Sequence, residues 1–265
     1  MGVHLRMEHP AMSQLARFMT AMVTPYTATG AVDFAGARKL ASRLVRSGND
    51  GLVITGTTGE APLLTDDEKA KLWEEVKQEV GAGHTVVAGA GTNDTRHSLE
   101  LTRRAERAGA DAILAVAPYY LRPPQEGIYQ HFRAIAESTS LPVIVYNVPS
   151  RTGVNITIET LLRLAQIPNI VGDKEANGDL AAAAQLIETR PDFLIWSGND
   201  SDNFHLWCMG AYGAISVTGH LVAAQQQQMF AAVQAGRLAE AAAIHRRLVP
   251  FTNACFLNGN PSSIR

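Results

Sequence analysis

Short apolar segments recur along the chain and are separated by longer segments with helical periodicity. Eight such segments occur, at residues 18–24, 51–55, 85–89, 112–117, 142–146, 169–172, 193–196 and 213–217. They are apolar without alternation, which is typical of parallel strands that are covered on both faces. Because these strands alternate with helices, the pattern predicts βα units, and eight of them predict an α/β protein of the (β/α)8 TIM-barrel type.

The segments between the strands carry apolar residues on one helical face. The predicted helices include 33–47, 65–80, 95–108, 220–235 and 237–256. Thr65 and Glu68 form a capping-box pair at the start of the second of these, and Gly236 separates the last two. We therefore expect three parts: an amino-terminal lead-in at 1–17, a barrel at 18–219 and a carboxyl-terminal helical extension at 220–265.

A doubly wound open sheet is the alternative architecture. Gly89-Ala90-Gly91 follows a strand, as a dinucleotide-binding loop would, but the third glycine of that motif is absent. The length of 265 residues also matches the roughly 250 residues of one barrel. These observations favour a closed barrel in one domain.

Composition excludes several classes of function. The net charge of −2 provides no basic field for nucleic acid or for an anionic membrane surface. The first eighteen residues lack the apolar core of a signal peptide, and no segment reaches the roughly 18 apolar residues of a membrane span, so we expect a cytoplasmic location. Cys208 and Cys255 form no CxxC pair, which indicates neither a disulfide nor a zinc site, and we expect both to be buried.

Lys174 stands at the carboxyl end of the sixth predicted strand, where the catalytic groups of barrels gather. If Lys174 points into the barrel, Ile170 and Gly172 share its face, whereas Asp173 and Glu175 face the helices. An uncharged lysine amine can form a Schiff base with a carbonyl substrate, and an apolar barrel mouth favours the uncharged amine. A lysine that merely extends to water is the alternative interpretation.

Two loops carry groups that suit a small carboxylate substrate. Gly56-Thr57-Thr58-Gly59-Glu60 follows the second strand, where glycines allow a close backbone approach and hydroxyls can bind a carboxylate. Tyr146 and Arg151 follow the fifth strand; a phenol can transfer protons, and a guanidinium can bind a carboxylate in a bidentate manner. The alternatives are an ordinary turn, a strand-end aromatic residue and a solvated charge.

Several long motifs occur in an order that identifies a resemblance. They are AMVTPY at 21–26, GTTGEAP at 56–62, VAGAGTND at 87–94, APYYLRPPQEG at 117–127, YNVPSRTG at 146–153, KEANGDL at 174–180, WSGND at 196–200 and GAISV at 213–217. From about Phe18 to Pro261 the chain resembles the dihydrodipicolinate synthase family of pyruvate-dependent lyases. The resemblance implies a class I Schiff-base enzyme on a TIM barrel, without a metal or an organic cofactor.

The resemblance also implies roles for particular residues. Lys174 would form the imine with pyruvate. Thr57, Tyr146 and Tyr120 would form a hydrogen-bonded proton relay, in which Tyr120 reaches into the site of a neighbouring subunit. We therefore expect a homodimer or a homotetramer.

Four further residues would form the substrate-binding site: two would bind carboxylates and two would line the pocket. Thr58 would bind the pyruvate carboxylate and Arg151 the carboxylate of L-aspartate 4-semialdehyde, while Gly198 and Ile215 would line the pocket. The implied reaction is the condensation of these two substrates to 4-hydroxy-tetrahydrodipicolinate, a step of lysine and diaminopimelate biosynthesis. An aldolase for N-acetylneuraminate or for a 2-keto-3-deoxy sugar acid is the alternative, and Arg151 favours the synthase.

The chain departs from the family in three places, of which the change of the usual SGDD motif to Ser197-Gly198-Asn199-Asp200 is modest. The residue before the lysine is usually aliphatic, but here it is Asp173, for which we expect a basic or hydrogen-bonding partner because an unpaired buried carboxylate is costly. From Ser262 onward the sequence differs from the family, so we expect a shortened helical extension. A non-catalytic, truncated paralogue is therefore a further alternative.

The resemblance also bears on feedback by lysine, which binds to sensitive relatives at a subunit interface near Tyr119 and Asn93. The neighbouring positions of this chain are Asp66, Lys69 and His97. Because Lys69 would repel a cationic effector, we expect weak or absent inhibition by lysine.

Overall fold

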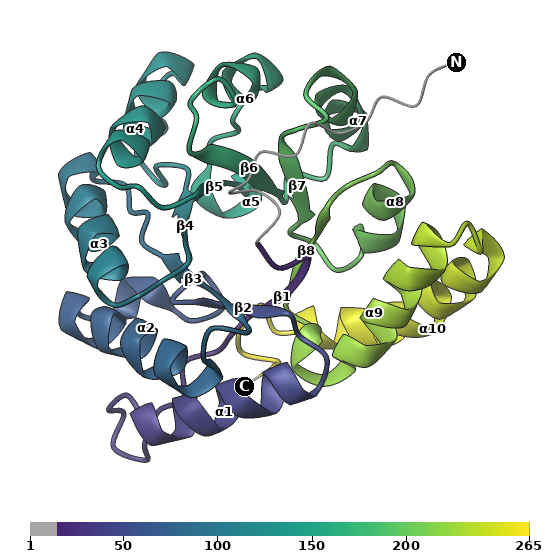
Figure 1. Cartoon of the computed structure of the whole chain (residues 1–265), viewed down its shortest axis with the longest axis horizontal. Coiled ribbons are helices and arrows are strands. Elements are labelled where there is room, and N and C mark those ends of the chain that lie inside the picture. The colour runs from purple at the N-terminus through teal and green to yellow at the C-terminus, as the bar shows by residue number, and fades with distance from the viewer. Residues whose placement is uncertain (1–14, 265) are drawn as a thin grey trace.

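Eight parallel strands pair in the order in which they occur in the chain, and the first pairs with the last (Figure 1). The strands are β1 (Phe18–Ala21), β2 (Gly51–Ile54), β3 (Thr85–Gly89), β4 (Ala112–Val116), β5 (Val143–Asn147), β6 (Ile170–Glu175), β7 (Leu194–Ser197) and β8 (Gly213–Ser216). This computed structural model describes residues 15–264, so most of the expected lead-in at 1–17 lies outside the described residues. The predicted (β/α)8 barrel is confirmed, and the open sheet is not formed.

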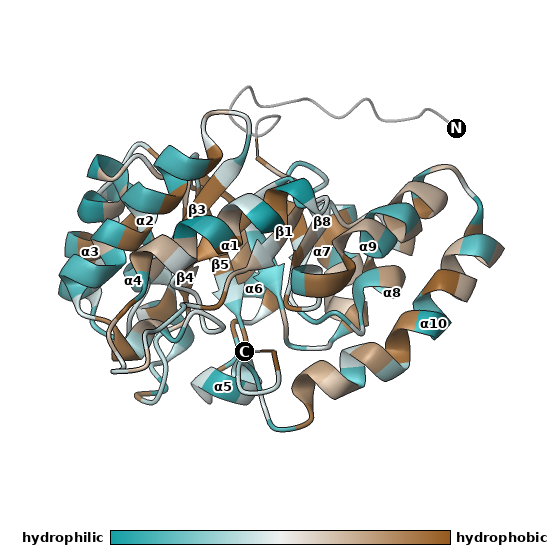
Figure 2. Cartoon of the chain, turned by 90° about the horizontal axis from the view of Figure 1, so that it is seen from below, coloured by the Kyte–Doolittle hydropathy of each residue, from teal (hydrophilic) through white to brown (hydrophobic). Residues whose placement is uncertain are grey.

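Helices surround the barrel, and two long ones follow the last strand. They are α1 (Phe34–Arg46), the short 3-10 helix η1 (Ala61–Leu63), α2 (Asp66–Val80), α3 (Thr95–Arg107), α4 (Gln125–Glu137), α5 (Pro149–Thr152), α6 (Ile158–Leu164), α7 (Leu180–Thr189), α8 (Asn203–Cys208), α9 (Gly219–Gln234) and α10 (Leu238–Phe256). In Figure 2 the hydrophilic colour is concentrated on the outer helices, for example on α2 and α3. No helix in the described part of the chain is long and apolar enough to cross a membrane.

The helix ends follow local sequence signals. Thr65 and Glu68 form the predicted capping box at the start of α2, in which each side chain bonds the backbone N–H of the other. Gly236 has a φ of 72° between α9 and α10, a conformation that glycine adopts without strain, and it separates these helices as predicted.

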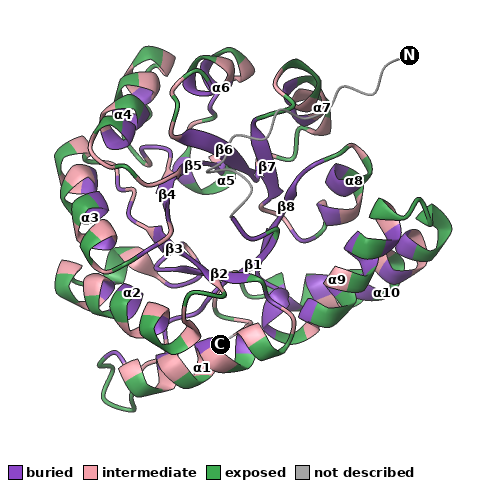
Figure 3. Cartoon of the chain, in the orientation of Figure 1, coloured by how far each residue is buried: buried purple, intermediate pink, exposed green. Residues whose placement is uncertain are grey.

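Strand side chains alternate between two buried layers. Val53, Val87 and Trp196 belong to a cluster that fills the barrel, whereas Leu52 and Ile54 pack outward against the helices. Almost all strand residues are accordingly buried, as Figure 3 shows; the exceptions are Gly89 and Val116, the last residues of β3 and β4, which are half-buried. The strand sequences do not alternate between apolar and polar residues, because both faces of each strand are covered.

Strand β6 differs from the prediction in length and in register. It continues to Glu175, because Asp173, Lys174 and Glu175 extend the ladder with β5 and β7. The pairing with β5 shifts after Ile170, which packs in the outer layer with the helices. The expectation that Ile170 shares the face of Lys174 is therefore wrong, and the cause is this one-residue irregularity, which the sequence pattern does not reveal.

The two cysteines are free and lie in different environments. Cys255 is buried in α10, as expected, whereas Cys208 is exposed at the end of α8, so the expectation of burial is wrong for Cys208. Its neighbours Leu206 and Trp207 occupy the buried side of this short helix.

Candidate active site

Lys174 and Tyr146 lie side by side at the carboxyl ends of β6 and β5. They are partners in the parallel ladder, and the lysine Nζ lies 4.1 Å from the centroid of the tyrosine ring. Each residue is only 5% exposed. Lys174 makes no ion pair among the described residues, so its amine is held in an environment formed mainly by apolar and aromatic groups.

A hollow of about 390 Å³ opens at this end of the barrel. Its lining comes from the loops after β2, β3, β4 and β5 and from the end of the chain, and includes Thr57, Tyr119, Tyr146, Arg151 and Asn260. Lys174 is not among the lining residues and adjoins the hollow through the Tyr146 ring. Reactive groups of barrel enzymes gather at this end of the strands, so this hollow is the candidate active site.

The loop after β2 is held tightly against β1. Thr24 donates a hydrogen bond of 2.7 Å from its hydroxyl to the carbonyl of Gly59. A Cβ atom on Gly59 would lie only 3.1 Å from the carbonyl oxygen of Met22, so a larger residue would push the loop away. Of the two threonines in this loop, Thr57 lines the hollow, whereas Thr58 is only 2% exposed and is not among the lining residues.

Asn260 joins two of the predicted carboxylate-binding residues. Its side-chain amide donates to the hydroxyl of Thr58 at 2.8 Å, and its backbone carbonyl accepts from Arg151 at 3.3 Å. Sequence reasoning assigned no role to Asn260. The available signal was the Asn260-Pro261 pair, which is the last part of the chain that matches the family pattern.

Gly198 lies near the lysine, and neither Gly198 nor Ile215 is among the residues that line the hollow. A Cβ atom on Gly198 would lie 3.2 Å from Cε of Lys174 and 2.8 Å from Cβ of Ala176, so this glycine makes room for the lysine side chain. Ile215 is fully buried in the cluster that fills the barrel.

Tyr120 lies apart from the other predicted relay residues. It is 84% exposed, next to the exposed Leu121, and its backbone N–H donates to the carbonyl of Thr152. Thr57 and Tyr146 line the same hollow, but within the part of the chain that the structure describes no hydrogen bond joins the hydroxyls of Thr57, Tyr146 and Tyr120. One chain alone therefore does not assemble the expected relay.

Contrary to the expectation of a basic or hydrogen-bonding partner, Asp173 has no basic partner within residues 15–264, and the side chain that interacts with it is another acid, Glu175. Asp173 is fully buried, and neither carboxyl oxygen makes a well-formed hydrogen bond. Burial, with a further contribution from Glu175, raises its pKa well above the ordinary value. A raised pKa means that this site favours the neutral, protonated form of the carboxyl group more than an exposed site does.

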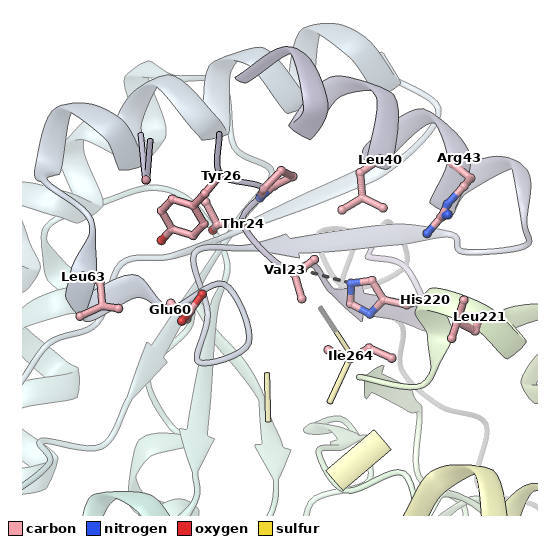
Figure 4. Close-up of a pocket in the computed structure, with 12 residues that line it drawn as sticks. Val23, Thr24, Tyr26, Leu40, Arg43, Glu60, Leu63, His220, Leu221 and Ile264 are labelled. Carbon is pink, nitrogen blue, oxygen red and sulfur yellow. Dashed lines mark hydrogen bonds between the residues drawn. The ribbon is translucent and has the colours of Figure 1, made fainter. Parts of the chain in front are cut away.

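A second, larger hollow of about 820 Å³ lies beside the active site (Figure 4). His220 borders it and accepts a hydrogen bond from the Val23 N–H through Nε2, so Nδ1 carries the proton that is donated to the carbonyl of Val217. None of the predicted catalytic side chains lines this hollow, which therefore is not the reaction site. Ile264 lines it, whereas Asn260 lines the catalytic hollow, so the end of the described chain runs between the two.

In residues 15–264 no group of three or more His, Cys, Asp or Glu side chains could hold a metal ion. The fold and the site are those of a (β/α)8-barrel enzyme with its reactive groups at the carboxyl ends of the strands. Residues 14–265 match the Dihydrodipicolinate synthetase family, and the chain belongs to this family.

Known proteins that resemble the chain agree with this assignment. The chain is 52% identical over 255 residues to 4-hydroxy-tetrahydrodipicolinate synthase of Dehalococcoides mccartyi, covering 96% of this chain and 86% of that protein. The crystal structure of dihydrodipicolinate synthase from Bacillus anthracis superposes with a TM-score of 0.91 at 44% identity, over 93% of this chain and 85% of that one. The chloride-inhibited enzyme from Acinetobacter baumannii, solved with pyruvate, gives a TM-score of 0.91 at 38% identity, over 94% and 86% of the two chains.

Proposed function

We propose that the protein is a lyase that condenses pyruvate with L-aspartate 4-semialdehyde to 4-hydroxy-tetrahydrodipicolinate. The observation that carries this proposal is the buried Lys174 amine, 4.1 Å from the Tyr146 ring centroid, beside a hollow that Arg151 also lines. The relatives named for this activity support it, as does the pyruvate bound to the Acinetobacter baumannii enzyme.

The reaction begins at Lys174. Its uncharged amine attacks the carbonyl carbon of pyruvate, and loss of water leaves an imine. Removal of a methyl proton gives an enamine, whose carbon attacks the aldehyde of the second substrate. The amine of that substrate then displaces Lys174 as the ring closes, and the enzyme is regenerated.

Tyr146 and Thr57 transfer the protons of these steps, since both line the hollow and Tyr146 contacts the lysine. Tyr120, which is 84% exposed, completes the relay in the site of a second subunit of a homodimer or homotetramer. In this assignment the protein is a cytoplasmic enzyme that works as an oligomer. The site of one chain contains the hydroxyls of Thr57 and Tyr146 and needs the Tyr120 hydroxyl of another subunit.

Thr58 and Arg151 bind the two substrate carboxylates. Support comes from Asn260, a neutral amide whose polar groups already engage both side chains. An arginine suits a carboxylate because its planar guanidinium can form two parallel hydrogen bonds. Gly198 makes room for the lysine side chain, and Ile215 belongs to the cluster that fills the barrel.

Borohydride trapping tests the nucleophile. With pyruvate present, reduction should add a stable adduct to the peptide that contains Lys174. Lys69 provides an internal control, since it is also only 5% exposed and lines the same hollow. Labelling of Lys174 in wild type, with none on Lys69 or in Lys174→Ala, is the expected result; an unmodified Lys174 overturns the assignment.

A pair of turnover assays tests the second substrate. We expect product from pyruvate and aspartate semialdehyde and none from the cleavage of N-acetylneuraminate or 2-keto-3-deoxy sugar acids. The reverse pattern would make the protein an aldolase. Trapping at Lys174 without turnover of either class would make it a non-catalytic paralogue.

A further inference from the structure

The catalytic strand carries two carboxyl groups on the face opposite to Lys174. Asp173 and Glu175 are 0% and 6% exposed, and because they are two residues apart on one strand they project to the same side. The ladder partners of Asp173 are Val145 on β5 and Ile195 on β7, both aliphatic. Two acids are therefore buried in the layer between the barrel and the helices.

The surrounding elements supply no described cation for these acids. The ionisable groups around Glu175 are Glu159 on α6, Asp179 before α7 and Asp202 before α8, all of them acidic. Arg163 of α6 pairs with Glu126, and Arg190 after α7 pairs with Asp192, so both arginines are engaged elsewhere.

Hydrogen bonds offset only part of the free-energy cost of burying the two carboxyl groups. Glu175 accepts a hydrogen bond from the backbone N–H of Asn177. The oxygens of Asp173 make no well-formed hydrogen bond, and the side chain with which Asp173 interacts is the second acid, Glu175. A buried carboxylate without a partner has a high free energy, and its protonated form has a much lower one. The environment thus favours retention of protons by this pair.

We propose that Asp173 and Glu175 are a proton-dependent element on the outer face of the catalytic strand, which holds the strand in place while protonated and loosens it when the protons are lost. A cavity of about 170 Å³ between α6 and α7 is lined by Glu175, though not by Asp173, and gives solvent a route to Glu175. Because Lys174 lies between the two acids on β6, loosening there displaces the catalytic amine. The element is independent of which substrates the enzyme uses.

The direction of the pH effect follows from the proton balance. Burial raises the pKa of Glu175 to about 7 from an ordinary 4.5, and burial raises that of Asp173 well above 3.8. For each acid, at pH values between its ordinary pKa and its raised pKa, the folded chain keeps a proton that the unfolded chain has released. Stability therefore falls as pH rises from about 4.5 through 7, and falls further as Asp173 ionises.

Thermal unfolding across pH 5 to 9 tests the proposal. The midpoint of the wild type should fall by roughly 5 to 10 °C over this range, and the fall should be clearly smaller in Asp173→Asn, in which a neutral group of similar shape replaces the acid. Asp67→Asn is the matched control, because the Asp67 side chain is 92% exposed; it should follow the wild type. Parallel curves for the wild type and Asp173→Asn would overturn the proposal.

Infrared spectroscopy provides a second readout that does not depend on stability. At neutral pH the wild type should show the carbonyl band of a protonated carboxylic acid, and this band should be lost on raising the pH and diminished in Asp173→Asn. If Asp173→Asn does not fold, Glu175→Gln and the wild-type titration give the same comparison. Absence of the band in the wild type at pH 7 would contradict the proposal.

Discussion

The side-chain amide of Asn260 donates a 2.8 Å hydrogen bond to the hydroxyl of Thr58, a residue 202 positions earlier in the chain. This bond brings the segment after α10 back to the mouth of the barrel, where the Asn260 carbonyl also meets Arg151. The carboxyl-terminal extension thus contributes to the candidate active site and is not only an addition to the barrel.

Replacement of Asn260 should therefore impair catalysis. In Asn260→Ala, Thr58 and Arg151 lose a common partner, and we expect kcat/KM to fall roughly 10-fold, the effect of one net hydrogen bond. Steady-state kinetics with both substrates varied would measure this. Asn258→Ala is the control, since Asn258 is exposed and does not line the hollow; equal kinetics for the two variants would refute a role for Asn260.

Addition of one methyl group at Gly198 should displace the lysine. The new Cβ would lie 3.2 Å from Lys174 Cε and 2.8 Å from Ala176 Cβ, and displacement of a reacting group by about 1 Å can lower the rate by roughly 100-fold. We expect Gly198→Ala to fold, with kcat reduced by about that factor and with slower borohydride trapping. Gly83→Ala is the control, because no atom lies within 4 Å of a Cβ added there. A wild-type kcat in Gly198→Ala would show that the neighbouring atoms accommodate the added methyl group without displacing Lys174.

Lysine should inhibit the enzyme weakly or not at all. Lys69 is buried at the hollow that Tyr119 also lines, and Asp66 lies 3.7 Å from its Nζ while also bonding His97. The ammonium group of Lys69 repels a cationic effector there. Initial rates measured over a lysine titration would test this, and half-inhibition below millimolar lysine would contradict it.

Removal of that charge should increase sensitivity to lysine. In Lys69→Gln, Asp66 loses its lysine partner and becomes available to an added ammonium group, so we expect stronger inhibition than in the wild type. Lys71→Gln is the control, since Lys71 lies over the Phe34 ring outside the hollow. Unchanged inhibition in Lys69→Gln would locate the cause of insensitivity elsewhere.

His131 should make the protein less stable in mild acid. Burial lowers its pKa to about 4 from 6.5, and its Nε2 has no hydrogen-bond partner, so the folded state resists protonation that the unfolded chain accepts. The free energy of unfolding should decrease as pH falls from about 6.5 to 4, by at most about 3 kcal/mol.

Comparison of His131→Gln with the wild type isolates this effect, because the carboxyl pair of β6 acts in the opposite direction over much of the same range. Denaturant unfolding at pH 4.5 and 6.5 would measure the difference. His84→Gln, at a partly exposed histidine, should keep the wild-type pH dependence. If His131→Gln loses as much stability between pH 6.5 and 4.5 as the wild type does, His131 is not the source of the acid sensitivity.

Parts of the site could be predicted from the sequence and parts could not. The pairing of Lys174 with Tyr146 followed from their positions at the ends of successive strands, since such ends meet at one face of a barrel. The face of Ile170 was predicted wrongly because one register irregularity with β5 inverts the alternation at that point. Asn260 gave no local signal for its role, because its position depends on where α10 directs the chain.

The sequence by itself determined the closed barrel, the boundaries of α1, α2, α3, α9 and α10 to within one residue, and the strand that carries Lys174. It could do so because apolar runs, helical periodicity and capping residues act over short separations. Only the tertiary structure decided that Asp173 has no basic partner among the described residues, that Tyr120 is exposed and does not line the hollow of its own chain, and that Asn260 reaches Thr58. These relationships join residues that are far apart in the chain, or depend on what packs around a side chain, and such information exists only once the elements have assembled.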